Sequence, residues 1–210
     1  LIRSGDVIPK VHKVIAPSEQ GKAPPSDMET VWNSTKIDLV LKDKANNSIV
    51  LMTDPKHILI TGASSGIGAA LAKAYAANNT TLSLTGRNKR RLENTAIACR
   101  DLGAHVLTRS IDVSHRAAMA LWIKEVDAAV PLDLVIANAG ISGGPGGISF
   151  ETEEQARTIF STNFSGVLNT LWPAIASMRT RNKGHIAIVS SLAGLRGMST
   201  TPAYSASKAA

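Results

Sequence analysis

From Lys56 onward, short apolar runs alternate with stretches in which apolar residues recur at helical spacing. Short apolar runs are typical of strands buried on both faces, and they predict strands at 57–60, 82–85, 106–113, 132–138 and 185–190. The intervening periodicity predicts helices that begin near 66 and 202, and helices over 89–102, 114–127 and 153–178. This alternation indicates an α/β fold, a Rossmann-like doubly wound parallel sheet with right-handed crossovers.

Local signals refine three of these helices. The helix after residue 66 is expected to bury its recurring apolar residues, which are Ile67, Leu71, Ala74 and Tyr75. The helix over 114–127 is expected to begin at Ser114, because serine is a favoured N-cap residue. The segment 153–178 is interpreted as one long helix, whose expected apolar face is Ile159, Phe160, Val167, Leu168, Leu171 and Ile175.

Residues 1–55 differ in texture from the rest and carry five of the nine prolines. Apolar runs at 37–41 and 49–53 flank a polar turn, which predicts a β-hairpin, and residues 11–16 are a candidate strand. We therefore predict a small N-terminal extension over 1–55, interpreted as the remnant of a β-rich module, and a catalytic domain over 56–210. The parallel sheet is expected to be incomplete at its C-terminal end, because a sixth strand would follow Ala210.

Composition narrows the possible partners. A hydrophobic content of 44% and a charged content of 19% are ordinary for a globular protein. The net charge is +7, but the basic residues cluster only at 87–91, where a phosphate-bearing small molecule or a solvated surface explains them as well as a polynucleotide. With one cysteine, Cys99, no intrachain disulfide can form. We predict a cytoplasmic protein with no nucleic-acid partner, no membrane segment and no metal site.

A glycine-rich turn, Thr61-Gly62-Ala63-Ser64-Ser65-Gly66-Ile67-Gly68, joins the first predicted strand to its helix. Gly62 permits a tight turn, Gly66 lets the backbone approach a pyrophosphate, and Gly68 lets helix and strand pack closely. Free N–H groups and the helix dipole then favour an anion. The turn is not a P-loop, because the Gly-Lys-Ser/Thr ending is absent.

The sequence TGASSGIG resembles the TGxxxGxG fingerprint of the short-chain dehydrogenases/reductases. Its glycine spacing differs from the GxGxxG of medium-chain dehydrogenases and from the TGxxGxxG of sugar-nucleotide epimerases. The resemblance runs over 56–210 and implies a nicotinamide-dependent oxidoreductase that moves a hydride to or from a small carbonyl or alcohol substrate. It also implies a homo-oligomer in the full-length protein, assembled through the long helix around 167–175 and the last helix.

The resemblance also implies which nicotinamide cofactor binds. In this family the NAD-dependent members carry an Asp where this chain has Gly86, so no carboxylate would repel a 2′-phosphate. Arg87 can form forked, charge-assisted bonds to such a phosphate, and Ser64 can assist. We therefore expect a preference for NADP(H) rather than strict exclusion of NAD, although Arg87 is also readable as a solvated arginine at a strand end.

Further cofactor contacts are carried over from the family. Asp112 is expected to contact the adenine side of the cofactor or to order its loop, and a capping carboxylate before the next helix is an equally compatible role. Asn138-Ala139-Gly140 matches the family's NAG motif, in which small residues let the backbone lie beside the cofactor and Asn138 ties neighbouring strands together. The cofactor-binding residues predicted in all are Gly62, Ser64, Ser65, Gly66, Ile67, Gly68, Arg87, Asp112, Asn138, Ala139, Gly140, Tyr204 and Lys208.

Tyr204 and Lys208 form a YxxxK motif, and residues four apart on a helix are neighbours. A free phenol ionises only near pH 10, but a neighbouring cation favours the phenolate. Tyr204 can then donate a proton during carbonyl reduction or accept one during alcohol oxidation. In the family, the lysine equivalent to Lys208 also binds the nicotinamide ribose.

Two further residues complete the set that the resemblance implies. Ser191 lies thirteen residues before Tyr204, which is the family's spacing for the serine that hydrogen-bonds the substrate oxygen. Ser190 is the rival, and its spacing assigns it a structural role. Asn163 matches the family's helix asparagine, which holds a water that links the lysine to solvent.

Two other functions stay open at this level. One is a catalytically silent dinucleotide-binding sensor or scaffold, and the other is a nucleic-acid or anionic-surface binder that uses the basic cluster at 87–91. The identity of the substrate is not readable from the sequence, since the loop at 142–147 is merely glycine-rich.

Overall fold

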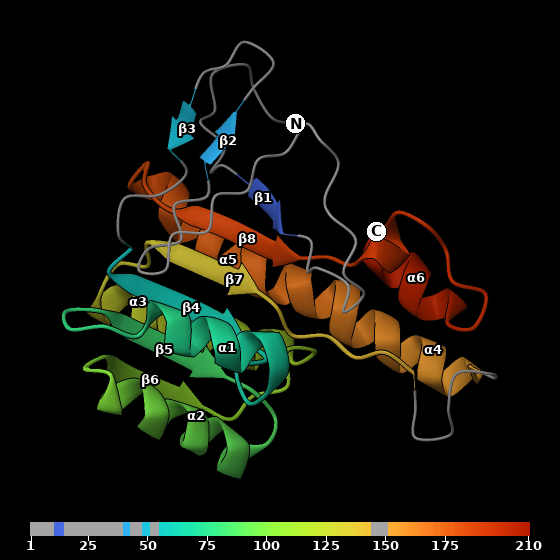
Figure 1. The fold of residues 1–210 in the computed structure, drawn as a ribbon, viewed down its shortest axis with the longest axis horizontal. Helices are drawn as coiled ribbons and strands as arrows, with labels where there is room; N and C mark the ends of the chain where they lie inside the picture. The colour runs from blue at the N-terminus through green and yellow to red at the C-terminus, as the bar shows by residue number, and fades with distance from the viewer. Residues whose placement is uncertain (1–10, 15–39, 43–47, 51–54, 144–150) are drawn as a thin grey trace. The chain divides into compact units, whose positions relative to one another are not determined.

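The computed structural model describes residues 11–14, 40–42, 48–50, 55–143 and 151–210, the first three ranges by their backbone alone (Figure 1). The chain divides into two units, residues 1–16 with 56–210 and residues 17–55. In the second unit, β2 (Val40–Lys42) pairs antiparallel with β3 (Ser48–Val50), which confirms the predicted hairpin with shorter strands.

The first unit is built on a parallel sheet of six strands among its described residues, in the order β1-β8-β7-β4-β5-β6 (Figure 1). Their bounds are β1 Val11–Val14, β4 His57–Thr61, β5 Thr81–Thr85, β6 His105–Arg109, β7 Leu134–Ala137 and β8 His185–Val189. The order reverses at β4, whose neighbours are β5 and β7, so the predicted Rossmann-like doubly wound sheet is confirmed. The pairing of β1 with β8 was not predicted.

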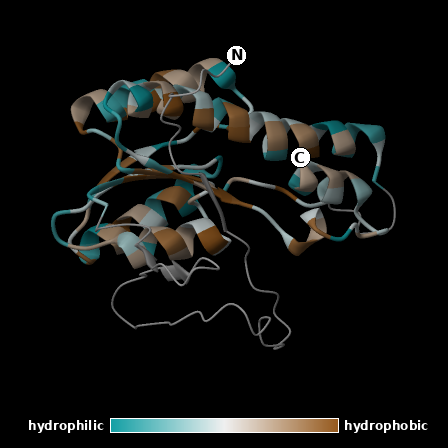
Figure 2. Ribbon diagram, turned by 90° about the horizontal axis from the view of Figure 1, so that it is seen from above, coloured by the Kyte–Doolittle hydropathy of each residue, from teal (hydrophilic) through white to brown (hydrophobic). Residues whose placement is uncertain are grey.

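Helices cover both faces of this sheet. They are α1 Gly66–Tyr75, α2 Lys89–Asp101, α3 Arg116–Ala129, α4 Glu153–Phe160, α5 Gly166–Thr180 and α6 Pro202–Ala209. α1 and α2 pack together on one face, and α3 and α5 pack together on the other, with the apolar strands between the layers (Figures 1 and 2). In the part of the chain that the structure describes, no helix combines the length and apolarity that crossing a membrane requires.

The main core lies between the sheet and the α3–α5 pair. Leu59, Val135 and Ile186 from three neighbouring strands are completely shielded from solvent and meet side chains of both helices. The helix residues of this cluster include Met119, Trp122, Ile123, Val126, Leu171, Ala174 and Met178. Each large apolar side chain removed from water contributes about 1.5–3 kcal/mol, so this layer holds the strand ends in place.

The predicted apolar face of α1 is wrong at Ile67 and Ala74, while Leu71 and Tyr75 are half-buried. The residues that α1 buries are Gly68 and Ala72, whereas Ile67 is 46% exposed and Ala74 is exposed. Small residues face the sheet because α1 lies very close to the end of β4. The recurrence of large apolar residues therefore did not identify the residues that α1 buries most deeply.

The predicted long helix is interrupted. α4 and α5 are joined by a π-helical turn, Ser161–Ser165, whose wider winding shifts the phase of the helix. Of the predicted apolar face, Ile159 and Leu171 are buried, but Phe160 and Leu168 are exposed. The N-cap prediction was also wrong by one residue, since α3 is capped at His115 and the Ser114 hydroxyl instead donates to Asp112.

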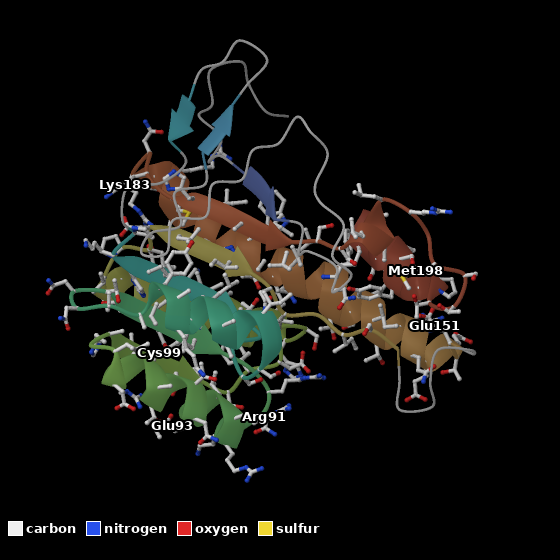
Figure 3. The ribbon with its side chains drawn as sticks, in the orientation of Figure 1. Arg91, Glu93, Cys99, Glu151, Lys183 and Met198 are labelled. Atoms are coloured by element: carbon white, nitrogen blue, oxygen red, sulfur yellow. The ribbon has the colours of Figure 1, made fainter. Side chains whose placement is uncertain are left out.

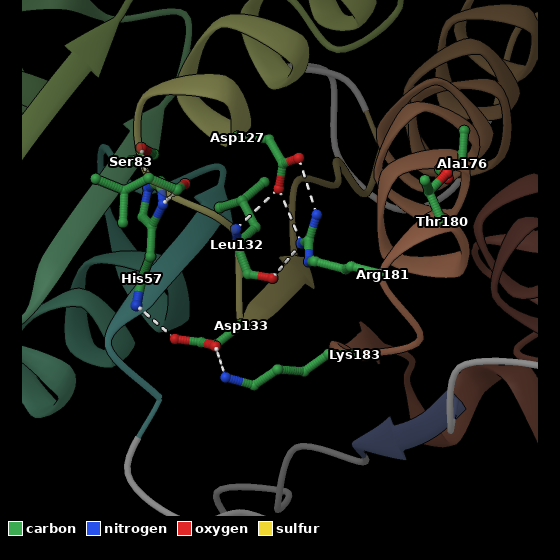
Figure 4. Close-up of polar contacts among 10 residues, drawn as sticks. His57, Ser83, Asp127, Leu132, Asp133, Ala176, Thr180, Arg181 and Lys183 are labelled. Atoms are coloured by element: carbon green, nitrogen blue, oxygen red, sulfur yellow. Dashed lines mark hydrogen bonds and ion pairs between the residues drawn. The ribbon is translucent and has the colours of Figure 1, made fainter.

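A polar network ties the elements together at the edge of the sheet where the parallel strands begin (Figure 4). His57 is completely buried, with Nδ1 2.6 Å from the Val130 carbonyl and Nε2 2.8 Å from the Ser83 hydroxyl. Asp133 accepts from the N–H groups of Lys56 and His57 and pairs with Lys183. A second pair, Arg181 with Asp127, joins α5 to α3, and Arg181 also donates to the Leu132 carbonyl.

The buried histidine makes stability depend on pH. Burial lowers the pKa of His57 from its ordinary 6.5, although the bond to Val130 and the charges of Asp127 and Asp133 oppose this. A carbonyl can only accept, so Nδ1 carries the proton and the neutral ring accepts from Ser83 through Nε2. The unfolded chain takes up a proton near pH 6.5 while the folded chain resists it, so stability is present above that pH and is lost as pH falls toward the folded pKa.

Urea unfolding on both sides of pH 6.5 measures this effect. We expect the free energy of unfolding of the wild type to fall as the pH is lowered through 6.5. His57→Gln should show a smaller fall, because residue 57 no longer titrates. Equal falls in the two proteins would remove His57 as the source. The carboxylates contribute at lower pH, since burial, which raises the pKa of Asp133, is outweighed by its hydrogen bonds and by Lys183.

Candidate active site

The glycine-rich turn lies where β4 ends and α1 begins. Gly62 has φ +70° and Gly66 has φ +55°, conformations that glycine adopts without strain. A Cβ at Gly68 would collide with the Gly62 carbonyl oxygen and lie 2.6 Å from Asn138 Nδ2. The turn therefore requires glycine at 62 and 68, as the sequence indicated.

Thr61 and Asn138 lock the ends of the two central strands together. Asn138 Nδ2 donates to the Thr61 carbonyl at 2.9 Å, and Thr61 Oγ1 accepts from the N–H groups of Asn138 and Ala139 at 3.0 and 3.1 Å. These bonds join the end of β7 to the turn after β4. The predicted strand-tying contact of Asn138 is present.

The start of α1 has the properties of an anion cradle. The first N–H groups of a helix have no acceptor within it, and Ser65 at the N-cap makes no side-chain capping bond. Ser65, Gly66 and Ile67 are exposed, and a Cβ at Gly66 would meet nothing within 4 Å. The open backbone and the positive end of the helix fit a pyrophosphate.

The end of β5 comes close to the same turn. The Ala63 N–H donates to the Thr85 carbonyl at 2.9 Å, and a Cβ at Gly86 would lie 3.0 Å from Ser64 Oγ. Because Gly86 has no side chain, Ser64 can pack against its backbone, next to Arg87. Thr85 Oγ1 is buried and has no hydrogen-bond partner among the residues that the structure describes.

Arg87 and Asp112 face each other just beyond the ends of β5 and β6. Arg87 Nη1 lies 3.8 Å from Asp112 Oδ2, and the arginine side chain is 58% exposed. Burial alone would raise the pKa of Asp112, but hydrogen bonds from the Ser114 N–H and hydroxyl and the charges of Arg87 and His115 lower it. Asp112 therefore orders its loop as an ionised acceptor, and Arg87 keeps most of its guanidinium available to a ligand.

Tyr204 and Lys208 lie on α6, as predicted. Lys208 Nζ is 5.9 Å from the centre of the Tyr204 ring and donates to the Val189 carbonyl at 3.1 Å. Burial lowers the pKa of Lys208. The ammonium is therefore held at the end of β8, 5.9 Å from the centre of the Tyr204 ring.

The two serines after β8 have different surroundings. Ser190 is buried and its hydroxyl donates to the Lys208 carbonyl at 3.3 Å, a structural contact. Ser191 is half-buried and caps the 3-10 turn Leu192–Gly194 by accepting from the Ala193 N–H at 3.2 Å. α6 packs against this turn, so Ser191 lies at the same edge of the sheet as the YxxxK pair.

Asn163 occupies the π-helical turn and is almost fully buried. Its Oδ1 accepts from the Ile141 N–H at 2.8 Å, and its Nδ2 donates to the Ile141 carbonyl at 2.9 Å and to Ser207 Oγ at 3.0 Å. A Cβ at Gly140 would lie 3.3 Å from both Asn163 Oδ1 and Lys208 Nζ. The glycine after β7 therefore leaves these two polar groups close to each other.

Two residues that hold α6 were not predicted from the sequence. Ser207 connects Asn163 to the Tyr204 carbonyl, and Glu151 Oε2 accepts from the Ala203 N–H at 2.5 Å, in the first turn of α6. Figure 3 shows Glu151 beside α6 and the start of α4. Ser207 was visible as a serine within the YxxxK motif, but nothing in the sequence places Glu151 next to residue 203.

The predicted site residues thus form connected groups at one edge of the sheet. The glycine turn, Ser64, Arg87 and Asp112 lie at the ends of β4, β5 and β6, while Gly140, Asn163, Lys208 and Tyr204 lie at the ends of β7 and β8. Carboxyl ends of parallel strands at a reversal of strand order are where such sheets bind their ligands. The arrangement can hold a dinucleotide along the edge and place a phenol, an ammonium and a hydroxyl near one of its ends.

Comparisons with known proteins agree with this geometry. The family model for short chain dehydrogenases matches residues 56–210. An uncharacterized oxidoreductase of Myxococcus xanthus is 40% identical over 152 residues, which cover 72% of this chain and 60% of that protein. An NADP-dependent 3-hydroxy acid dehydrogenase, YdfG of Salmonella typhimurium, is 33% identical over 158 residues, with coverages of 72% and 60%.

A solved structure is also similar. The crystal structure of a metagenomic short-chain oxidoreductase in complex with NADP superposes with a TM-score of 0.67 at 28% identity. The match covers 73% of this chain and 70% of that one. The chain spans about 60% of the length of the two curated relatives.

Proposed function

Because the chain belongs to the short-chain dehydrogenase family, we propose that it is an NADP(H)-dependent reductase of a ketone or aldehyde, reversible toward the corresponding alcohol. The observation that carries the proposal is the Lys208 ammonium, 5.9 Å from the Tyr204 ring and beside Gly140. This pair lies at the same edge of the sheet as the glycine turn. The named relatives support the chemistry, since one is an NADP-dependent hydroxy acid dehydrogenase.

The residues fit a nicotinamide dinucleotide. The open amides at the start of α1 would hold the pyrophosphate, Arg87 with Ser64 the 2′-phosphate, and Asp112 the adenine side. The backbone of 138–140, with Tyr204 and Lys208, would hold the nicotinamide half. The bound cofactor supplies the hydride.

The side chains of this chain supply the proton and the electrostatics. The Tyr204 phenol donates its proton to the substrate oxygen during reduction and accepts it during oxidation. The Ser191 hydroxyl donates a hydrogen bond to the same oxygen and stabilises the negative charge that develops on it. The Lys208 ammonium places a positive charge 5.9 Å from the centre of the Tyr204 ring, and Asn163 holds the water that links Lys208 to solvent.

A change at Arg87 tests the preference for NADP(H). In Arg87→Ala we expect NADPH to bind about 10- to 100-fold more weakly, because a charge-assisted bond to the 2′-phosphate is lost, and NADH binding to stay unchanged. Fluorescence titration with both nucleotides measures this. The matched control is Arg90→Ala, a change in the same exposed basic cluster. Equal losses in the two variants, or equal losses for NADPH and NADH, would contradict the assignment.

Three features of the whole protein remain proposals. A homo-oligomer is supported by exposed apolar residues at four-residue spacing along α4, the π-helical turn and α5, the most exposed being Trp172 at 64%. These residues are Phe160, Phe164, Leu168 and Trp172. The division into an extension over 1–55 and a catalytic domain over 56–210, and the cytoplasmic location, stay predictions.

A further inference from the structure

Ser207 lies on α6 between the two residues of the YxxxK motif and is almost fully buried. Its hydroxyl donates to the Tyr204 carbonyl at 2.8 Å and accepts from Asn163 Nδ2 at 3.0 Å. A serine that bonds back to its own helix is common. The bond from Asn163 is different, because it joins α6 to a residue 44 positions earlier in the chain.

This second bond adds to two bonds with the Ile141 backbone, and the three together fix which way the Asn163 carboxamide points. Its two N–H groups go to the Ile141 carbonyl and to Ser207, and its oxygen therefore faces the Ile141 N–H. The same oxygen and Lys208 Nζ lie 3.3 Å from one Cβ position at Gly140. Without Ser207, one buried N–H of Asn163 would have no partner in this network, and such a group costs free energy until it rearranges.

We propose that Ser207 is a positioning residue for the reaction, which orients the Asn163 carboxamide and holds α6 against the π-helical turn. The Asn163 oxygen and the Lys208 ammonium then both stay next to Gly140, and Lys208 stays 5.9 Å from the centre of the Tyr204 ring. The inference rests on the proposed function, because it assigns Ser207 a role in the proton transfer of that reaction.

Ser205 offers a matched control on the same helix. It is as deeply buried as Ser207, but its hydroxyl accepts from the Met198 N–H at 3.0 Å and so ties down the preceding loop. Ser205→Ala and Ser207→Ala remove the same atom from the same helix. Only Ser207→Ala removes the acceptor of the Asn163 N–H. Ser205→Ala removes the acceptor of the Met198 N–H instead.

The test uses the full-length protein with NADPH and a ketone on which the wild type turns over. For Ser207→Ala we expect kcat to fall about 10- to 100-fold, because a displacement of about 1 Å at a catalytic group costs on the order of 10²-fold, and the pH profile of kcat to shift. NADPH affinity, measured by fluorescence without turnover, should stay within about twofold, because Ser207 bonds to Asn163 and Tyr204 and not to the glycine turn. Ser207→Thr, which keeps the hydroxyl, should restore most of kcat.

A double-mutant cycle with Asn163→Ala tests the mechanism. Once Asn163 is gone, Ser207→Ala should have little further effect on kcat, since the two residues act as one unit. If Ser207→Ala fails to fold, Ser207→Cys gives the same comparison, because a thiol of similar size is a weak donor and acceptor.

Two outcomes would overturn the inference: a kcat and pH profile for Ser207→Ala that match those of Ser205→Ala, or additive effects of Ser207→Ala and Asn163→Ala. Failure of the proposed function looks different, since Tyr204→Phe would then remain active in the same assay. An inactive Tyr204→Phe together with an unaffected Ser207→Ala would reject the role of Ser207 and leave the proposed function standing.

Discussion

Tyr204→Phe should lower kcat for carbonyl reduction about 10³-fold, within the range that a positioned general acid contributes. The substitution removes the oxygen that carries the proton and leaves the ring, which packs 5.9 Å from the Lys208 ammonium. NADPH affinity should fall far less than kcat, because Tyr204 is one of several residues that would hold the nicotinamide half, and the glycine turn and Arg87, which would hold the phosphates, lie at the ends of other strands. NADPH oxidation with a panel of ketones, together with nucleotide titration, measures both quantities.

Tyr75→Phe is the matched control, since Tyr75 is the other of the two tyrosines in the sequence. It ends α1 and is half-buried, and burial raises the pKa of its phenol, so it is a poor proton donor. This variant should turn over like the wild type. If Tyr204→Phe kept wild-type turnover, the proton would have to come from another group. If the wild type bound NADPH without turnover, the sensor or scaffold function would be favoured.

Gly68→Ala should weaken NADPH binding more than 100-fold and destabilise the fold by about 1–3 kcal/mol, the usual cost of forcing extra atoms into a packed site. The added Cβ would collide with the Gly62 carbonyl oxygen and lie 2.8 Å from the Gly62 carbonyl carbon. Both are backbone atoms and cannot swing away as a side chain would. α1 must therefore move from β4, and the amides at its start move with it.

Gly197→Ala is the control for the added methyl group, because a Cβ there meets nothing within 4 Å. It should leave urea unfolding and NADPH titration unchanged. A Gly68→Ala protein that binds NADPH as the wild type does would show that the start of α1 is not the cofactor's phosphate site.

Much of the fold could be predicted because its signals are local. Apolar runs separated by helical periodicity predicted the parallel sheet, and the glycines of the turn predicted a close approach that the structure shows between Gly68 and Gly62. The spacing within the YxxxK motif placed Tyr204 and Lys208 on one helix because helix geometry is regular.

The features that were missed depend on contacts between distant parts of the chain. Gly68 and Ala72 face the sheet because β4 comes so close. The prediction relied on large apolar residues such as Ile67 and Tyr75, and so it did not select these two small ones. The π-helical turn at Asn163 goes with its bonds to Ile141 and Ser207, which lie 22 and 44 residues away. Glu151 reaches Ala203 across 52 residues, and no periodicity within a single element carries that information.

The central claim is that Tyr204 delivers the proton while a hydride moves from the nicotinamide to a carbonyl carbon. A single-turnover experiment with NADPH deuterated at the transferred position, a ketone substrate, and the wild-type and Tyr204→Phe proteins tests it most directly. The account predicts deuterium on the carbinol carbon of the wild-type product and almost none with Tyr204→Phe on the same time scale. Equal deuterium transfer by the two proteins, or an alcohol formed without the label, would contradict it.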